Sequence, residues 1–289
     1  MEKAKRAKDE LLMSIEENTD KSNMKHFAIM EYLLSNYKQV GYMTIENLSE
    51  ALNSKDNEVL KYLNSIGYSS FENFRQEIRR VSTVELSLTE RFQISSSMGT
   101  KINHVFYEVA NKETDNIRKL QDTFQQDEYS AIISKLLQSP EVIVVGTRAS
   151  SNIAIYAGEI FSRIGIKTTT IASGATEELN KVTGIDRNAV VLSFGFARYP
   201  KETVRILSFF KKRNFDILSI TDSPFSPLVP FSTHSIIIPC ESISFTDFFA
   251  SPYIVINTLA ISISQLEADK SLKSLREYEE ISKDMGFFI

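Results

Sequence analysis

The sequence predicts two parts of different fold class, an all-helical N-terminal domain and a doubly wound, mainly parallel five-stranded α/β domain. Residues 1–90 show helical periodicity that is interrupted by turn signals. From Glu141 onward, short apolar runs alternate with helical segments, which is typical of parallel strands that are buried on both faces. The 289 residues of the chain are enough for two such domains.

After a charged, helical N-terminus, four short helices are expected from residue 24 onward. Apolar residues recur at three- and four-residue steps over residues 24–37, which predicts an amphipathic helix. Thr44 is a good N-cap for the next helix. A third helix ends at Gly67, as it would at a left-handed cap, and Ser69 or Ser70 caps the fourth. The residues expected to face inward in the last three helices are Ile45, Leu48, Leu52, Val59, Leu60, Leu63, Ile66, Phe71, Phe74 and Ile78.

The middle of the chain is predicted to be helical, polar and weakly periodic. The serine cluster at residues 95–97 and the following Gly99 indicate a hinge near the boundary between the two domains. We therefore expect a helical domain over residues 1–90, a helical linker over 91–125 and the α/β domain over 126–289.

The α/β domain is expected to contain five strands joined by helical crossovers, which gives a mainly parallel sheet. The predicted strands lie in the segments EVIVVG, KTTTIAS, AVVLSFG, FDILSITDS and HSIIIPC. The predicted helices cover residues 151–164, 175–181 and 200–213, and one long helix runs from about residue 251 to residue 280.

The composition excludes several classes of protein. Cys240 is the single cysteine of the sequence, which excludes a disulfide framework and fits a reducing compartment. Three histidines without ligand spacing predict no metal site, and the missing three-glycine fingerprint predicts no dinucleotide cofactor. No run reaches about 18 apolar residues, so we expect a cytoplasmic protein without a signal peptide or a membrane span. The net charge of −4 argues against a general polyanion binder.

Three loops carry residue types that bind anions at the carboxyl edge of a parallel sheet, where backbone N–H groups and helix N-termini gather. The loops are GTRASS after the first strand, GFARYPKET after the third and TDSPFSP after the fourth. A phosphorylated polyol fits these loops better than a dinucleotide does. The residues expected to bind it are Gly146, Thr147, Ser150, Ser151, Gly195, Arg198, Thr221 and Ser223.

Each of these residues also has a purely structural interpretation. A serine or threonine after a strand often does no more than cap the next helix. Arg198 can pair with Glu202 on the first helical turn instead of binding an anion. For an enzyme, Glu177 or Glu178 would be the best general base, but no partner acid accompanies them, and carboxylates at a helix start commonly serve the helix dipole. No catalytic residue is therefore assigned.

The succession of motifs resembles the RpiR/MurR-like transcriptional regulators of bacteria over nearly the whole chain. The segment YMTIENLSEAL…LNSIGYSSFENFRQEI looks like the DNA-binding domain of that family, and VIVVGTRASSNIA, ARYPKETV and ILSITDSPFSPL follow in the order of a sugar isomerase (SIS) domain. The resemblance implies a helix-turn-helix domain before a SIS domain, and a dimer or tetramer. It also implies that the protein binds operator DNA and responds to a phosphosugar. We expect no enzymatic activity, and a SIS-type sugar-phosphate isomerase or lyase that uses Glu177 or Glu178 is an alternative.

Both the expected DNA-binding surface and the expected ligand-binding loop depart from the family pattern. The resemblance places DNA contacts at Thr44, Ser54, Lys55, Asn57 and Lys61, with Lys38 as a further phosphate contact. Glu58 lies in the same row, and residues 1–90 hold 12 Lys plus Arg against 15 Asp plus Glu, so a sensor that does not bind DNA is an alternative. In the third-strand loop, the family carries two serines, a glycine and a threonine, and the residues at those places here are Gly195, Ala197, Arg198 and Pro200, so every hydroxyl is missing. Ligand binding is therefore expected to depend on Arg198, Thr147, Ser150 and Ser151.

Overall fold

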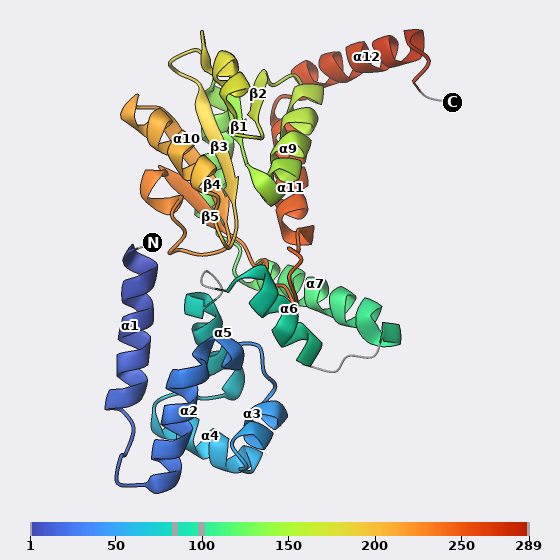
Figure 1. The fold of residues 1–289 in the computed structure, drawn as a ribbon. Coiled ribbons are helices and arrows are strands. Elements are labelled where there is room, and N and C mark those ends of the chain that lie inside the picture. Colours follow the sequence, from blue (N-terminus) through green and yellow to red (C-terminus); the bar gives the residue numbers. More distant parts are fainter. Residues whose placement is uncertain (1, 83–85, 98–101, 288–289) are drawn as a thin grey trace. The chain divides into compact units, whose positions relative to one another are not determined.

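The computed structural model describes residues 2–82, 86–97 and 102–287, and its contacts divide the chain into two compact units (Figure 1). The first, the helical unit, comprises residues 1–110 and 242–246. The second, the sheet unit, comprises residues 111–241 and 247–289. Gly99 of the predicted hinge lies outside the described residues.

The helical unit confirms the predicted series of capped helices. Thr44 is the N-cap of the second predicted helix, because its hydroxyl accepts a hydrogen bond from the Asn47 N–H. Gly67 has a left-handed φ of 99°, and the Ser70 hydroxyl accepts from the Asn73 N–H. The helices are α1 (Glu2–Glu17), α2 (Met24–Val40), α3 (Ile45–Ala51), α4 (Asp56–Ser65), α5 (Phe71–Ser82) and α6 (Leu88–Ser97), followed by a short 3₁₀ turn (Ile102–His104).

The core of the helical unit lies between α1, α2, α3, α4 and α5. Its fully buried side chains include Leu33, Leu48, Val59, Tyr62, Leu63, Phe74 and Ile78. Tyr62 is the polar exception in this set, and its hydroxyl lies 2.9 Å from the hydroxyl of Thr19, just after α1. This hydrogen bond satisfies a buried polar group and attaches the end of α1 to α4. The helix α2 ends at Val40, three residues beyond the predicted Tyr37, and is kinked at Asn36, where φ is −122° and ψ is 17°.

The sheet unit contains a five-stranded parallel sheet in the order β2-β1-β3-β4-β5, which confirms the predicted fold class. The chain passes from β1 to β2 on one side and then returns to place β3 on the other side of β1. In open parallel sheets, ligands commonly bind beyond the carboxyl ends of the two strands that flank such a reversal, which here are β1 and β3. The strands are β1 (Val142–Val145), β2 (Thr168–Ile171), β3 (Val190–Gly195), β4 (Asp216–Thr221) and β5 (His234–Ile237).

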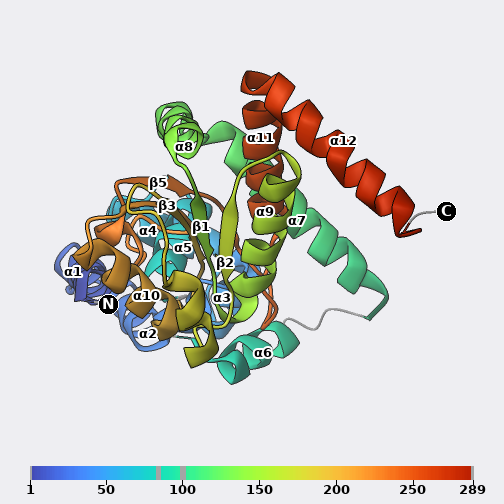
Figure 2. The same cartoon turned by 90° about the horizontal axis from the view of Figure 1, so that it is seen from above.

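Helices cover both faces of this sheet (Figure 2). Val142 and Val144 pack with α8, α9 and α11, whereas Ile143 and Val145 pack with α10 on the opposite face. This alternation follows from the two-residue period of a strand. The helices are α7 (Val105–Asp122), α8 (Gln126–Gln138), α9 (Ser151–Arg163), α10 (Lys201–Lys212), α11 (Ala250–Leu266) and α12 (Ala268–Asp284), with 3₁₀ turns at Arg148–Ser150, Thr176–Val182 and Val229–Phe231.

The prediction of one long final helix is wrong, because the structure divides it into α11 and α12 at Glu267. This residue has φ −116° and ψ 49°, which is outside the helical region. The break redirects α12 onto the end of α9, where Ser271 is buried and donates a hydrogen bond of 3.3 Å to the Ile164 carbonyl. Tertiary packing therefore overrides the local helical preference of the sequence. In the part of the chain that is described, no helix has the length and apolar character needed to cross a bilayer.

Candidate ligand site and candidate DNA interface

The loop after β1 brings a glycine and three predicted hydroxyls to the carboxyl edge of the sheet. Gly146 is needed for packing, because a Cβ there would lie 2.6 Å from the Ser150 carbonyl oxygen. Thr147 is fully buried, and its hydroxyl lies 2.8 Å from that of Thr203 in the first turn of α10. Ser150 and Ser151 lie at the start of α9, and neither hydroxyl is hydrogen-bonded to the described chain. Of the predicted hydroxyls in this loop, these two have no hydrogen-bond partner among the described residues, and Ser150 is only 4% exposed.

Two arginines beside the edge adopt a backbone conformation that is rare for residues other than glycine. Arg148 has φ 58° in the loop after β1, and Arg198 has φ 66° in the loop after β3. The Arg148 guanidinium donates to the Glu202 carboxylate over 2.7 Å. The alternative partner considered for Arg198 is therefore occupied by Arg148. The Arg198 side chain is exposed and makes no ion pair with the residues that the structure describes.

The hydroxyls predicted after β4 serve local structure. Thr221 is fully buried and donates a hydrogen bond of 2.6 Å to the Gly195 carbonyl at the end of β3. The Ser223 hydroxyl accepts from the Phe225 N–H over 3.1 Å, which closes a turn. Gly195 itself packs against Leu228, with 2.7 Å from a virtual Cβ to Cδ2. These residues shape the carboxyl edge of β3 and β4.

Asp222 is a site residue that sequence reasoning missed. It follows β4 directly, and its carboxylate accepts from the Ala197 N–H over 3.0 Å and from the Tyr199 hydroxyl over 2.7 Å. Burial and the neighbouring Asp222 charge raise the pKa of Tyr199, so the phenol stays protonated and donates. The Ala197 N–H in the loop after β3 is therefore already hydrogen-bonded to a carboxylate of the protein. No local pattern indicates this contact, because the two loops are 25 residues apart.

Glu178 is fixed as a carboxylate in the loop after β2. It accepts from the N–H groups of Ala172, Ser173 and Gly174 over 3.0, 2.9 and 2.8 Å, and from the Lys181 ammonium over 3.2 Å. Burial raises the pKa of Glu178, but these four donors outweigh it and lower the pKa to about 2. A carboxylate with this pKa is a poor general base at neutral pH.

The Glu177 side chain lies outside the described ones. Among the described residues, no three His, Cys, Asp or Glu side chains come together as metal ligands would.

The candidate DNA interface contains α3 and α4 of the helical unit. Lys55, Asn57 and Lys61 are exposed, and Asn57 and Lys61 are four residues apart, so they share one face of α4. The Ser54 hydroxyl donates to Glu58 over 3.3 Å, and the Thr44 hydroxyl caps α3. Among the predicted contacts, the hydroxyls of Ser54 and Thr44 are therefore hydrogen-bonded within the helical unit, the first to the Glu58 side chain and the second as the cap of α3.

Glu58, the acidic residue among the expected DNA contacts, forms an ion pair within the helical unit. The Lys25 ammonium in α2 lies 2.6 Å from its carboxylate, and the Lys55 N–H also points to that carboxylate over 3.5 Å. The hydrogen bond from Lys25 is the main reason that the pKa of Glu58 is lowered. An ion pair presents less repulsion to DNA phosphates than a free carboxylate does.

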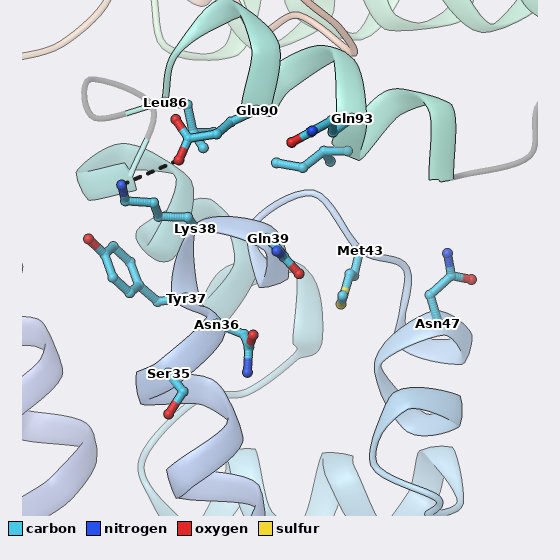
Figure 3. Close-up of a pocket in the computed structure, with 11 residues that line it drawn as sticks. Ser35, Asn36, Tyr37, Lys38, Gln39, Met43, Asn47, Leu86, Glu90 and Gln93 are labelled. Carbon is cyan, nitrogen blue, oxygen red and sulfur yellow. Dashed lines mark ion pairs between the residues drawn. The ribbon is translucent and has the colours of Figure 1, made fainter.

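A cavity of about 570 Å³ with a mixed polar and apolar lining lies in the helical unit between α2, the start of α3 and α6 (Figure 3). Lys38, a predicted phosphate contact, lines this cavity, and its ammonium lies 3.7 Å from the Glu90 carboxylate of α6. The other polar side chains labelled around it are Ser35, Asn36, Tyr37, Gln39, Asn47 and Gln93. Lys38 is thus held partly by α6, a contact that no local sequence pattern predicts.

Comparison with known proteins gives two family matches. Residues 9–82 match the helix-turn-helix domain of the rpiR family, and residues 135–262 match the SIS domain. A curated relative from Caldanaerobacter subterraneus subsp. tengcongensis, an uncharacterized HTH-type transcriptional regulator, is 20% identical over 277 residues, 94% of this chain and 96% of that protein.

Several solved structures share the fold. The sugar isomerase domain of an RpiR transcription factor from Sphaerobacter thermophilus is 21% identical, with a TM-score of 0.59 over 61% of this chain and 99% of that one. The Vibrio vulnificus NanR protein complexed with ManNAc-6P is 19% identical, with a TM-score of 0.57 over 95% of this chain and 98% of that one.

Proposed function

The chain belongs to the rpiR family of helix-turn-helix proteins with a SIS domain, and we propose that it is a transcription regulator that binds operator DNA and a phosphorylated sugar or related anion. The observation that carries this proposal is the succession of the two domains along one chain. The NanR structure, which aligns over nearly the whole chain, contains ManNAc-6P. In this proposal the protein acts in the cytoplasm as an oligomer.

The exposed side chains of α4 support DNA binding. In helix-turn-helix proteins the second helix enters the major groove, and residues near its N-terminus reach the base edges. Asn57 is near the N-terminus of α4 and suits base contacts, whereas Lys61, one turn later, suits a phosphate. The Lys25–Glu58 ion pair reduces the repulsion that the Glu58 carboxylate alone would exert on DNA phosphates.

The carboxyl edge of the sheet supports binding of an anion in an unusual way. The free hydroxyls of Ser150 and Ser151 lie at the N-terminus of α9, where the helix dipole favours negative charge. Arg198 is exposed on the neighbouring loop, and a guanidinium binds phosphate or carboxylate through two parallel hydrogen bonds. The arginine therefore takes the role of the hydroxyls that the β3 loop lacks.

The state of Glu178 supports a protein without enzymatic activity. A sugar isomerase needs a general base near neutral pKa, and Glu178 is held ionised with a pKa of about 2. Its four donors also leave the carboxylate little freedom to reach a substrate.

DNA binding is tested by electrophoretic mobility shift at low salt, with the DNA upstream of the gene and its neighbours. We expect retardation of a specific fragment and weaker binding by Lys61→Ala. Lys211→Ala, which removes an exposed lysine from α10, is the matched control and leaves binding unchanged. If an unbiased selection of genomic fragments yields no bound DNA, the alternative of a sensor without DNA binding replaces this proposal.

Effector binding is tested by a thermal-shift screen of hexose, pentose and amino-sugar phosphates. A binding compound is expected to lose at least tenfold in affinity with Arg198→Ala, because a charge-assisted hydrogen bond contributes about 1.5–3 kcal/mol. Arg187→Ala changes an exposed arginine that precedes β3, at the other edge of the sheet, and serves as the control. An unchanged affinity in Arg198→Ala would show that another group holds the anion.

A further inference from the structure

A short segment between β5 and α11 belongs to the helical unit, although the chain on both sides of it belongs to the sheet unit. Residues 242–246 group with residues 1–110, whereas residues 111–241 and 247–289 form the sheet unit. This segment, called the strap, is therefore attached to the sheet unit at both of its ends. A segment this short follows any movement of its two attachments.

The first attachment of the strap is Glu241, which α7 holds by both its backbone and its side chain. The Asn116 side chain is fully buried, and it donates to the Glu241 carbonyl over 2.9 Å and accepts from the Glu241 N–H over 3.2 Å. The Glu241 carboxylate forms ion pairs with Lys112 and Lys119. Paired hydrogen bonds to one buried side chain fix the chain where the strap begins.

The second attachment packs on the loop that carries Arg198. Phe249 is the N-cap of α11, and the centroid of its ring lies 5.6 Å from that of Phe196. Phe196 is buried in the loop after β3, two residues before Arg198. The Ala250 N–H donates to the Glu113 carboxylate over 3.3 Å. Since packed rings cannot interpenetrate, a movement of the β3 loop displaces the end of the strap.

The strap itself packs on α6 within the helical unit. The ring centroids of Phe245 and Phe92 are 6.0 Å apart, and the hydroxyls of Ser244 and Ser95 are 2.8 Å apart. The Ser242 hydroxyl accepts from the Ser244 N–H over 3.1 Å, which closes a turn inside the strap. A strap with internal hydrogen bonds and two contacts to one helix passes a shift of its ends to that helix.

The helix α6 has room to respond to such a shift. The cavity of about 570 Å³ lies between α6, α2 and the start of α3 (Figure 3). A helix beside a cavity loses fewer contacts when it moves than a helix that is packed on all sides. The Lys38 ammonium lies 3.7 Å from the Glu90 carboxylate of α6. A movement of α6 therefore repositions Lys38, an expected phosphate contact.

We propose that the strap couples the two binding sites of the protein. Binding of an anion beside Arg198 moves Phe196 and Phe249, and the strap carries this movement to α6 and the ion pair with Lys38. The inference rests on the proposed function, because it needs an anion site and a DNA site. It adds the residues through which one site acts on the other. By linkage, DNA then changes the affinity for the anion by the same factor.

Hydrogen exchange with inorganic phosphate as the probe tests whether the strap transmits anion binding. In the wild type, phosphate is expected to change exchange by about twofold or more in residues 195–200 and in α6, relative to chloride at equal ionic strength. Phe245→Ala removes a side chain that is 46% exposed, and it is expected to keep the change in residues 195–200 and lose the change in α6. Phe106→Ala is the matched control, because Phe106 is 74% exposed in the helical unit and its ring packs on Tyr107, and it keeps both changes.

The outcomes of this experiment separate the proposal from the proposed function. No change in residues 195–200 of the wild type would remove the anion site, and the coupling with it. A change there without a change in α6 would overturn the coupling alone. An α6 response in Phe245→Ala that equals the wild-type response would assign the coupling to α7, which also joins the two units, and would overturn the proposal.

Fluorescence anisotropy with an operator fragment measures the coupling itself. In the wild type, phosphate is expected to change the Kd for DNA by about fivefold relative to chloride at equal ionic strength. Phe245→Ala and Ser244→Ala are expected to bind DNA like the wild type in chloride and to show a change of about twofold or less in phosphate. Phe106→Ala keeps the full change. A wild type whose DNA affinity is the same in both salts, or strap variants with the full change, would overturn the proposal and leave both binding sites in place.

Discussion

The Arg148 guanidinium donates a hydrogen bond of 2.7 Å to the Glu202 carboxylate and joins the loop after β1 to the first turn of α10. The hydrogen bond from Arg148 lowers the pKa of Glu202, so the pair is ionised at neutral pH. Both groups lie beside the carboxyl edge of the sheet. An anionic ligand bound there would compete with the Glu202 carboxylate for the Arg148 guanidinium.

Replacement of Glu202 by an uncharged residue is expected to strengthen the binding of an anion. Glu202→Gln removes one negative charge and releases Arg148, and the affinity for a phosphorylated effector rises about two- to fivefold, the size expected for an exposed ion pair. Isothermal titration calorimetry measures the change. Glu159→Gln, which removes a carboxylate paired with Arg163 on α9, is the control. Equal or weaker binding by Glu202→Gln would exclude competition for Arg148.

Asp222 is expected to stabilise the β3 loop. Asp222→Ala removes the acceptor of the Ala197 N–H and the Tyr199 hydroxyl, and the free energy of unfolding falls by about 1–3 kcal/mol. Urea denaturation measures the loss. Ser223→Ala, which removes one local turn hydrogen bond, costs less than about 1 kcal/mol. Similar losses in both variants would mean that Asp222 has no special role.

The lowered pKa of Glu178 predicts that the stability of the protein depends on pH. Its pKa falls from 4.5 to about 2 on folding, so its contribution is complete above pH 4.5 and is lost as the pH falls towards 2. Glu178→Gln destabilises the protein by about 1–3 kcal/mol at pH 7. The difference in unfolding free energy between wild type and variant shrinks below pH 4.5. A difference that does not change between pH 7 and pH 3 would contradict the assignment.

The Lys25–Glu58 ion pair is expected to tune DNA binding. Lys25→Ala exposes the Glu58 charge and weakens binding, whereas Glu58→Gln leaves binding equal or stronger. The double variant Lys25→Ala/Glu58→Gln recovers most of the loss, because no unpaired carboxylate remains. Fluorescence anisotropy with a bound operator fragment measures all three. A double variant as weak as Lys25→Ala would show that Lys25 itself contacts DNA.

Features that depend on neighbouring residues were predictable from the sequence. The caps at Thr44, Gly67 and Ser70 and the five apolar strands all appear in the structure, because they follow from local backbone and burial preferences. The three strand-end loops also lie at one edge, because parallel strands place their carboxyl ends together. The break at Glu267 was not predictable, since it depends on the contact between α12 and α9.

The helical and the parallel α/β fold classes, and the loops that carry the candidate ligand site, thus follow from local sequence patterns. Which groups in those loops have a partner within the protein depends on the tertiary structure. The hydroxyls of Thr147 and Thr221 are hydrogen-bonded to residues 56 and 26 positions away in the sequence. Arg148 pairs with the Glu202 carboxylate, which was considered as a partner of Arg198. Residue types fix what a side chain can bind, but burial and distant partners fix whether it is free to do so.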